Sequence, residues 1–203
     1  MFIGGLLKFS MIDFPGKISA IVFTQGCNLN CNYCHNPELI PMTAQPPSLY
    51  SDGDVLDYLA KRRGALDGVV ITGGEPAVQP DLKDFIAKIK AMGYLVKLDT
   101  NGTNPALLKD LLASNLLDFV AMDIKAPVEK YSQVCGVPVD TNNIKASIAA
   151  IETSAVPHEF RTTYDKTLLN DADIELVRGL CRANHRVQEC LPVSNKPALR
   201  ITQ

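Results

Sequence analysis

The chain has 203 residues, of which 46% are hydrophobic and 21% charged, a composition typical of a globular protein with a packed core and not of a disordered or fibrous chain. Its 20 basic and 22 acidic residues nearly balance, so we expect neither a nucleic-acid partner nor attraction to an anionic membrane. No apolar run reaches the length of about 18 residues that a membrane-spanning helix requires, and the N-terminal stretch lacks the apolar segment of a signal peptide. We therefore expect a cytoplasmic protein, with residues 1–203 forming one domain.

Short apolar runs rich in β-branched residues alternate along the chain with segments of helical periodicity. They predict six strands, at residues 20–24, 69–72, 95–99, 119–124, 159–163 and 186–191. The first four runs are nearly continuous, which is typical of strands covered on both faces. Six strand–helix units without an internal repeat predict an α/β fold with parallel strands. Because a closed barrel of this type has eight strands, we expect an open partial (β/α)6 TIM-like barrel, with a doubly wound sheet as the alternative.

Capping residues mark where several helices should begin between these strands. Ser51 and Asp54 resemble a capping box, and Asn104 is followed by a proline, the usual first residue of a helix. Asn170 or Asp171 can cap a later helix. These positions agree with the alternation of strands and helices.

Polar residues cluster where the expected strands end. They are residues 27–34, the TGGEP run at 72–76, the DTNG run at 99–102, the DIK run at 123–125, Arg161 and the PVSN run at 192–195. The carboxyl ends of parallel strands meet at one edge of a sheet, where α/β folds build ligand sites. Turn chemistry alone accounts for Asn101 and Gly102. It does not account for Glu75, Asp123 and Lys125, which we therefore expect in a site at this edge.

Three of the six cysteines, Cys27, Cys31 and Cys34, follow one another with the spacing C-x3-C-x2-C. A structural zinc ion needs four ligands, and only His35 stands near enough in the sequence to complete the set. A c-type haem attachment site or a thioredoxin-like redox pair would leave Cys27 unused. The remaining alternative is an iron–sulfur cluster, for which thiolates are the normal ligands. A four-iron cluster with three protein ligands leaves one iron open to a small molecule.

The cysteine spacing, with Tyr33 before the last cysteine and GGEP after the next expected strand, resembles the signature of the radical S-adenosylmethionine (SAM) enzymes. The longer run MIDFPGKISAIVFTQGCNLNCNYCHNPEL resembles the activating proteins of anaerobic ribonucleoside-triphosphate reductase, relatives of the pyruvate formate-lyase activating enzyme. The DTNG and MDIK runs match the same group, so the resemblance spans about residues 10–165.

This resemblance implies that Cys27, Cys31 and Cys34 hold a [4Fe–4S] cluster and that SAM binds its open iron. The other implied cofactor contacts are Tyr33, His35, Gly73, Gly74, Glu75, Asp123, Lys125 and Arg161. Among them, the GGE run would receive the amino group of SAM, with glycines that let the ligand come close. Asp123 would bind the ribose and Lys125 the carboxylate. The resemblance also implies a monovalent-cation site made by Asp99, Thr100, Met122 and Asp123.

The implied activity is one-electron cleavage of SAM followed by removal of a hydrogen atom from a glycine of a partner enzyme. The expected partners are a glycyl-radical enzyme, first the large subunit of anaerobic ribonucleotide reductase, and a flavodoxin- or ferredoxin-type electron donor. The alternatives are a radical SAM enzyme acting on a small molecule, similar to 7-carboxy-7-deazaguanine synthase, and a zinc-binding interaction module.

The sequence departs from the pyruvate formate-lyase activating enzyme near its C-terminus. A histidine that contacts the cofactor late in that enzyme has no counterpart here, so Ser194 or Asn195 would replace it. No second cysteine-rich insert is present, and we expect one cluster. Cys181 on a helix and Cys190 in a strand are expected in the core, and Cys135 in a loop.

Overall fold

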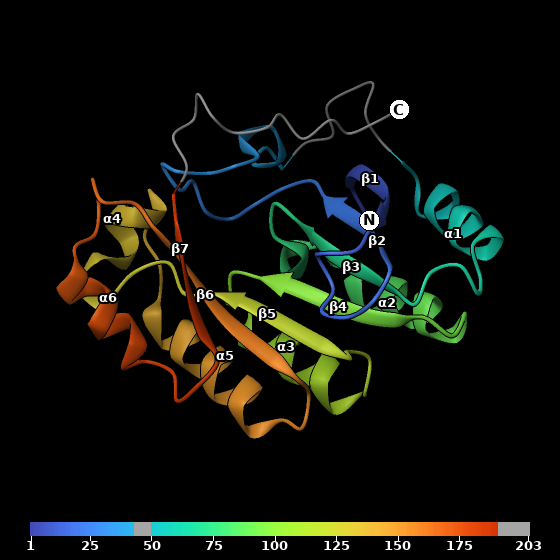
Figure 1. The fold of residues 1–203 in the computed structure, drawn as a ribbon. Helices are drawn as coiled ribbons and strands as arrows, with labels where there is room; N and C mark the ends of the chain where they lie inside the picture. The colour runs from blue at the N-terminus through green and yellow to red at the C-terminus, as the bar shows by residue number, and fades with distance from the viewer. Residues whose placement is uncertain (43–49, 191–203) are drawn as a thin grey trace.

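A seven-stranded sheet in the order β1-β2-β3-β4-β5-β6-β7 forms the centre of the protein (Figure 1). The structure is a computed structural model that describes residues 1–42 and 50–190. The strands are β1 Ile3–Ser10, β2 Ser19–Thr24, β3 Gly68–Gly73, β4 Leu95–Thr100, β5 Phe119–Asp123, β6 His158–Tyr164 and β7 His185–Glu189. The α-helices are α1 Asp52–Lys61, α2 Leu82–Ala91, α3 Pro105–Ala113, α4 Tyr131–Cys135, α5 Thr141–Thr153 and α6 Asp171–Arg178. Three 3-10 turns, η1 Pro37–Leu39, η2 Pro76–Val78 and η3 Val128–Lys130, complete the described elements.

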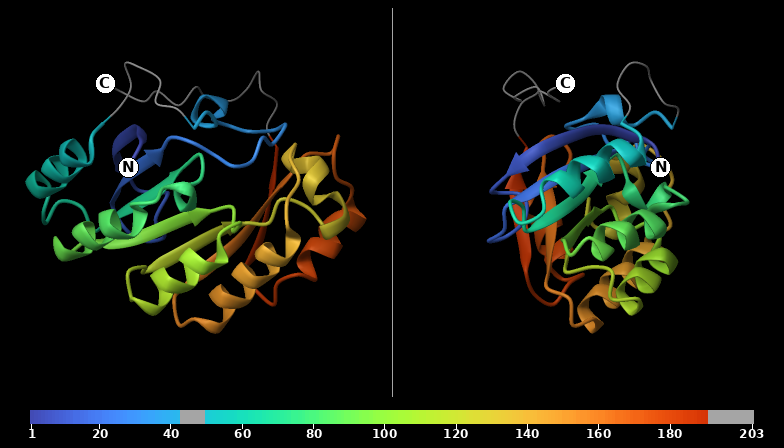
Figure 2. Two further views of the ribbon diagram at one scale, coloured as in Figure 1. Left: turned by 180° about the vertical axis from the view of Figure 1, so that it is seen from behind. Right: turned by 90° about the vertical axis from the view of Figure 1, so that its right-hand side faces the viewer.

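Strands β2 to β7 are parallel, and each pairs with the next one along the chain. A doubly wound sheet reverses its strand order at a switch point. This sheet has no such reversal, and its helices lie along one side of the curved sheet (Figure 2). The first and last strands of the described order do not pair, so the barrel stays open. The open partial barrel is confirmed, and the doubly wound alternative is wrong.

All six predicted strands are present, but the sheet has an additional one. β1 runs antiparallel to β2 along the edge of the sheet. Its sequence, IGGLLKFS, contains two adjacent glycines, which weaken the local strand signal. β1 is held as a strand by its pairing with β2, and the periodicity of its own sequence does not predict this pairing. At the other edge, β7 ends at Glu189, and Leu191 lies outside the described residues.

The helix starts agree with their capping signals. Ser51 and Asp54 form both hydrogen bonds of a capping box at the start of α1. Asn104 accepts a hydrogen bond from the backbone N–H of Leu107 at the start of α3. For α6 the cap is Asn170, whose side chain accepts from the backbone N–H of Asp173 at 3.0 Å. The structure thereby decides between Asn170 and Asp171.

The sheet separates two clusters of buried apolar residues. Residues such as Val22, Ile71 and Leu98 face the helices and belong to the large cluster. Their strand neighbours Ile21 and Val70 face the inner side of the curve and join a small cluster. Burial on both faces explains the continuous apolar runs of these strands. On β4, β5 and β6 the inner side instead carries charged residues, described below.

The three remaining cysteines differ in part from expectation. Cys135 is the last residue of α4 and is fully buried, so its assignment to a loop is wrong. Cys181 is buried but follows the end of α6, and Cys190 follows the end of β7 and is half-buried against the large cluster. The longest α-helix in the described part of the chain is α5 with 13 residues, and none there has the length and apolar character of a bilayer-spanning helix.

Candidate cofactor-binding site

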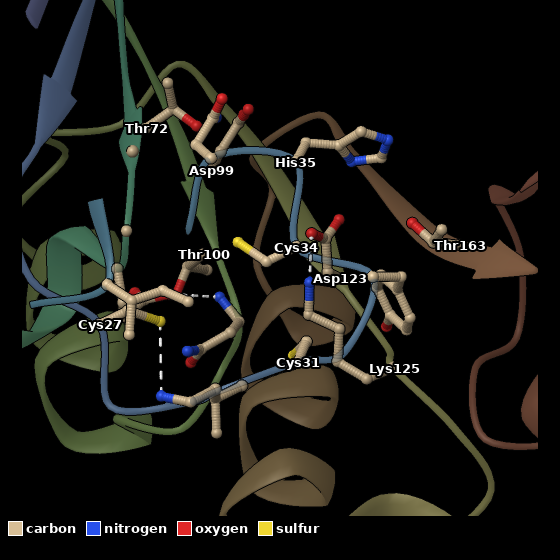
Figure 3. A pocket seen from close by; sticks show the side chains of 18 of the residues that line it. Cys27, Cys31, Cys34, His35, Thr72, Asp99, Thr100, Asp123, Lys125 and Thr163 are labelled. Carbon is tan, nitrogen blue, oxygen red and sulfur yellow. Dashed lines mark hydrogen bonds and ion pairs between the residues drawn. The ribbon is translucent and has the colours of Figure 1, made fainter. Parts of the chain in front are cut away.

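One pocket at the carboxyl ends of the parallel strands gathers residues that are far apart in the sequence (Figure 3). Its volume is about 860 Å3, including the part open to solvent. The predicted site residues that line it are Cys27, Cys31, Tyr33, Cys34, His35, Gly73, Gly74, Glu75, Asp99, Thr100, Asp123, Lys125 and Arg161. The site predicted at this edge of the sheet is therefore one continuous space.

Met122 is the predicted site residue whose side chain does not line the pocket. It is fully buried in the large cluster on the helix side of the sheet. Successive side chains of a strand point to opposite faces, so the side chains of Met122 and Asp123 cannot share one face. Ser194 and Asn195 lie outside the described residues.

Sequence reasoning missed several residues that line the pocket. They are Leu29, Asn36, Ile40, Thr72, Asn101 and Thr163. Thr163 could have been found, because it follows Arg161 by two positions in the same strand and therefore shares its face. The loop residues carry no comparable signal, because their places depend on contacts with other segments.

Backbone hydrogen bonds attach the start of the cysteine loop to the segment after β3 and to the end of η1. The N–H of Glu75 donates to the carbonyl of Gly26 at 2.8 Å. The N–H groups of Gly26 and Cys27 donate to the carbonyls of Leu39 and Ile40 at 2.8 and 3.0 Å. These bonds do not involve the thiols, so the start of the loop is held independently of any ligand.

Side-chain hydrogen bonds attach the same loop to the segment after β4. The Asn28 amide donates to the hydroxyl of Thr103 at 2.8 Å, and the Asn101 amide donates to the Asn28 carbonyl oxygen at 3.0 Å. Asn101 also accepts from the hydroxyl of Thr103 at 2.7 Å. Asn101 and Gly102 thus belong to a turn, as their sequence predicts, but Asn101 also positions the cysteine loop.

The two glycines of the GGE run are packed against the protein's own backbone. Gly73 has φ of 124°, a conformation that favours glycine. A β-carbon on Gly74 would lie 2.2 Å from the carbonyl oxygen of Gly26. We expected these glycines to leave room for a ligand. The described contacts show that they leave room for β2 and the cysteine loop.

Glu75 uses both carboxylate oxygens to join the end of β3 to the end of β4. Oε1 accepts from the N–H of Ala77 at 2.9 Å and from the hydroxyl of Thr100 at 2.7 Å. Oε2 accepts from the N–H of Asn101 at 2.6 Å. Burial raises the pKa of Glu75 to about 7, although these donors favour the ionised form. The side chain therefore supports the pocket wall, in addition to lining it.

We expect Glu75 to make the free energy of unfolding depend on pH. In the unfolded chain a glutamate titrates near its ordinary pKa of 4.5, whereas in the folded protein Glu75 keeps its proton until about pH 7. Between these values the unfolded state binds fewer protons, so the Glu75 contribution falls as pH rises. Urea unfolding from pH 4.5 to 8 gives the free energy of unfolding of the wild type and of Glu75→Gln. The difference between the two free energies at each pH measures the Glu75 contribution, and we expect it to fall as pH rises. A difference that is flat, or that grows with pH, would contradict the raised pKa.

A chain of ion pairs crosses the inner side of β4, β5 and β6. The ammonium group of Lys97 lies 2.6 Å from Asp99 Oδ1, and Arg161 Nη1 lies 3.4 Å from Asp99 Oδ2. Arg161 Nε lies 2.9 Å from Asp123 Oδ1. Lys125 Nζ lies 2.9 Å from Asp123 Oδ2, a contact that can be followed in Figure 3. Each carboxylate is thus paired with two basic side chains.

The neighbouring charges shift the pKa values of Asp123 and Lys125 and thereby determine whether these side chains are ionised. Burial acts to raise the pKa of Asp123, but the charges of Lys125 and Arg161 outweigh it and hold that pKa well below its usual range. Burial acts to lower the pKa of Lys125, but Asp123 raises it well above its usual value. All three side chains are therefore charged at neutral pH. Because Asp99 and Asp123 already have cationic partners, the monovalent-cation site stays a prediction.

The donor set of the pocket fits an iron–sulfur cluster. The three thiols Cys27, Cys31 and Cys34 line one pocket and form no disulfide. Within residues 1–42 and 50–190, no three His, Cys, Asp or Glu side chains converge as ligands of one metal ion. Thiolates are the normal ligands of iron–sulfur clusters, and in a four-iron cluster each thiolate binds a different iron.

The three thiols differ in acidity. Burial raises the pKa of Cys27 to about 11 and also raises that of Cys34. The pKa of Cys31 is lowered, chiefly by a hydrogen bond from the thiol of Cys135. Cys31 is therefore the thiol that ionises most readily among the three, and the thiolate is the form that binds metal.

The open barrel and its cysteine-lined pocket define an enzyme of the radical SAM superfamily. The chain belongs to this superfamily, because the family model described as "Radical SAM superfamily" matches residues 21–183. Membership implies a [4Fe–4S] cluster and SAM as cofactors. The three clustered thiols supply ligands of the kind that such a cluster requires.

Curated relatives are similar over much of the chain. It is 35% identical over 178 residues to a protein of Methanocaldococcus jannaschii named "Putative glycyl-radical enzyme activating enzyme MJ1227", covering 85% of this chain and 72% of that protein. It is 35% identical over 120 residues to the "Pyruvate formate-lyase-activating enzyme" of Clostridium pasteurianum, covering 57% of this chain and 48% of that enzyme.

Two solved structures share the fold. One is Streptococcus suis SuiB bound to S-adenosylmethionine, with a TM-score of 0.66 and 15% identity, covering 85% of this chain and 40% of that one. The other is anSMEcpe with bound AdoMet, with a TM-score of 0.63 and 19% identity, covering 82% of this chain and 49% of that one. At these identities the likeness extends to the fold alone.

Proposed function

We propose that this protein is a radical SAM activase that generates a glycyl radical on a partner enzyme, and that the partner is anaerobic ribonucleoside-triphosphate reductase. The observation that carries the proposal is the single pocket shared by Cys27, Cys31 and Cys34, the GGE run and the Asp123–Lys125 pair. The names of the two curated relatives support the same class of activity.

In this proposal each part of the pocket has a separate task. The cysteine loop holds a [4Fe–4S] cluster, which with SAM supplies one-electron chemistry able to remove a hydrogen atom from a glycine. Lys125 provides a positive charge for the carboxylate of SAM, and Asp123 accepts hydrogen bonds from its ribose. Gly73, Gly74 and Glu75 form the wall that faces its amino group.

The inner side of the open barrel is where a peptide segment of the partner would enter. β1 and β7 are the two edges of the described sheet and do not pair, so the curve is not closed. The charged side chains of Asp99, Asp123 and Arg161 line the pocket on this side. We further propose that the protein acts in the cytoplasm as one domain, residues 1–203, with a flavodoxin- or ferredoxin-type protein as electron donor.

Deuterium transfer tests the proposed activity directly. The protein is loaded with iron and sulfide without oxygen, reduced, and mixed with SAM and a candidate partner deuterated at its glycine Cα atoms. We expect deuterium in the 5′-deoxyadenosine product and a glycyl-radical signal in electron paramagnetic resonance spectra of the partner. Separate reactions with anaerobic ribonucleotide reductase and pyruvate formate-lyase identify the partner.

The rival functions give different results in the same experiment. Cleavage of SAM with no label from any glycyl-radical enzyme would contradict the activase and favour a small-molecule substrate. Zinc in place of iron and sulfide in protein purified without oxygen would favour an interaction module.

Lys125→Ala is expected to weaken binding of SAM. The change removes one charged hydrogen bond, worth about 1.5–3 kcal/mol, which corresponds to a loss of affinity of roughly 10- to 150-fold. Asp123 keeps its pairing with Arg161 Nε at 2.9 Å, so the pocket wall should persist. Binding is measured anaerobically on cluster-loaded protein, with Lys166→Ala, a change at an exposed surface ion pair, as control. Equal affinity of Lys125→Ala and wild type would remove Lys125 from the SAM contacts.

A further inference from the structure

Cys135 lies against the cysteine loop and has no task in the proposed function. It is the last residue of α4 and is fully buried. Its side chain is hydrogen-bonded to the side chain of Cys31. It does not line the pocket, so it has no access to a bound substrate. The thiol therefore touches an expected cluster ligand without lining the pocket itself.

Main-chain contacts hold this thiol in place. The N–H of Asn30 donates to the carbonyl of Cys135 at 2.9 Å, one residue before Cys31. Gly136 ends α4 with φ of 68°, and a β-carbon there would lie 2.4 Å from the carbonyl oxygen of Asn30. The end of α4 and the cysteine loop therefore pack backbone against backbone. Only glycine at position 136 permits this approach.

The start of α4 is also attached to the pocket. The hydroxyl of Tyr131, the first residue of the helix, accepts from the N–H of Lys125 at 3.2 Å. Tyr131 is almost fully buried, with 1% of its surface exposed. Both ends of this short helix thus contact segments that line the pocket. The distance between Cys135 and Cys31 is set by the fold and not by one flexible side chain.

The chemistry of the pair gives the hydrogen bond a direction. A cysteine that binds iron does so as a thiolate, which can only accept a hydrogen bond. A thiol buried among apolar groups keeps its proton, and Cys135 belongs to the large apolar cluster. With iron bound to Cys31, Cys135 would therefore be the donor and the sulfur of Cys31 the acceptor.

We propose that Cys135 donates its S–H hydrogen bond to the ligating sulfur of Cys31 and makes the cluster easier to reduce. Hydrogen bonds to the sulfurs are among the factors that set the reduction potential of an iron–sulfur cluster, because they stabilise the additional negative charge of the reduced state. This role rests on the proposed function, because it requires Cys31 to bind the cluster. Cys135 is then a positioning and tuning residue that acts through Cys31. A buried cysteine that only fills space would leave the potential unchanged.

The test compares reduction potentials of loaded proteins without SAM or partner. Four proteins are loaded anaerobically: wild type, Cys135→Ala, Cys135→Ser and the control Cys181→Ala. The control changes a buried cysteine beyond the end of α6. Iron and sulfide per chain are measured first, and the potential then follows from a redox titration monitored by electron paramagnetic resonance. We expect equal loading and a more negative potential for Cys135→Ala. Cys135→Ser should lie closer to wild type because its hydroxyl can donate, and Cys181→Ala should match wild type.

Each other result has a definite meaning. Equal potentials of wild type and Cys135→Ala at equal loading would overturn the tuning role and leave the proposed function intact. Loss of iron from Cys135→Ala and Cys135→Ser alike, in folded protein, would overturn it by showing that the thiol is needed for assembly. If Cys135→Ala does not fold, Cys135→Val takes its place, because valine fills the site with an apolar side chain that has no donor. A reduction potential of Cys135→Val equal to that of wild type would then overturn the tuning role, and a more negative one would support it. A wild type without iron and sulfide would overturn the proposed function itself, and this inference with it.

Discussion

Replacing Cys31 with alanine is expected to abolish binding of the iron–sulfur cluster while leaving the protein folded. The thiolate supplies one of three protein ligands, and a cluster with two is not expected to survive isolation. Activity on a glycyl-radical partner should fall to background. Iron and sulfide analysis of the anaerobically loaded variant measures the first effect, and the deuterium-transfer reaction measures the second.

The fold should persist because the loop is held by groups other than this thiol. The carbonyl of Gly26 and the N–H groups of Cys27 and Asn30 make backbone hydrogen bonds to three other segments. Cys31 itself is half-buried and contributes one side-chain hydrogen bond, worth about 1 kcal/mol. Circular dichroism and urea unfolding of the cluster-free proteins check this point, with Cys181→Ala as a variant that should keep its cluster. Four irons in Cys31→Ala would exclude this thiol as a ligand, and global unfolding would show that the loop depends on it.

Gly74→Ala is expected to displace the cysteine loop and sharply reduce cluster loading. The added β-carbon would lie 2.2 Å from the carbonyl oxygen of Gly26 and 2.7 Å from that of Leu39. Both are backbone atoms in hydrogen bonds, so neither can move without breaking a contact of the loop. Overpacking of a well-packed site, with the backbone shifts it forces, costs about 1–3 kcal/mol and occasionally more, so the free energy of unfolding should fall by at least this amount. Urea unfolding and iron content measure the two effects.

Gly53→Ala is the matched control for this change. Gly53 lies in α1 and is exposed, and the nearest atom to an added β-carbon is Ser51 Oγ at 3.5 Å. Alanine is a better helix former than glycine, so this variant should be more stable by about 0.5–1 kcal/mol and load normally. Normal loading of Gly74→Ala would contradict the close approach of β3 and the cysteine loop.

The strand pattern illustrates which parts of the fold a sequence can predict. The runs that became β2 and β3 are apolar on both faces because the helices cover one side and inner apolar residues the other. Their pairing in chain order follows from parallel strand–helix units, which leave few alternatives. β1 was missed because its glycine-containing run becomes a strand only by pairing with β2.

For the site, as for the fold, the sequence predicts which segments come together but not every contact between them. The positions of Cys27, Asp123 and Lys125 after their strands were sufficient to place them at one edge of the sheet. The orientation of Glu75 was not predictable, because it depends on a contact with the end of β4, 26 positions away. Strand alternation does predict that Met122 and Asp123 point to opposite faces. This limit does not apply to Thr163, which could have been predicted because strand alternation places it on the same face as Arg161.

The sequence by itself determined the order of the six parallel strands and their helices, because apolar periodicity and helix caps are local patterns. The class of cofactor followed from the resemblance of the cysteine run to the radical SAM enzymes. Only the tertiary structure decided that β1 forms the edge strand beside β2, that Gly74 makes room for the cysteine loop, and that Cys135 lies against Cys31. These features are contacts between distant segments. Their geometry depends on how the sheet curves and how each helix packs, which no single stretch of sequence specifies.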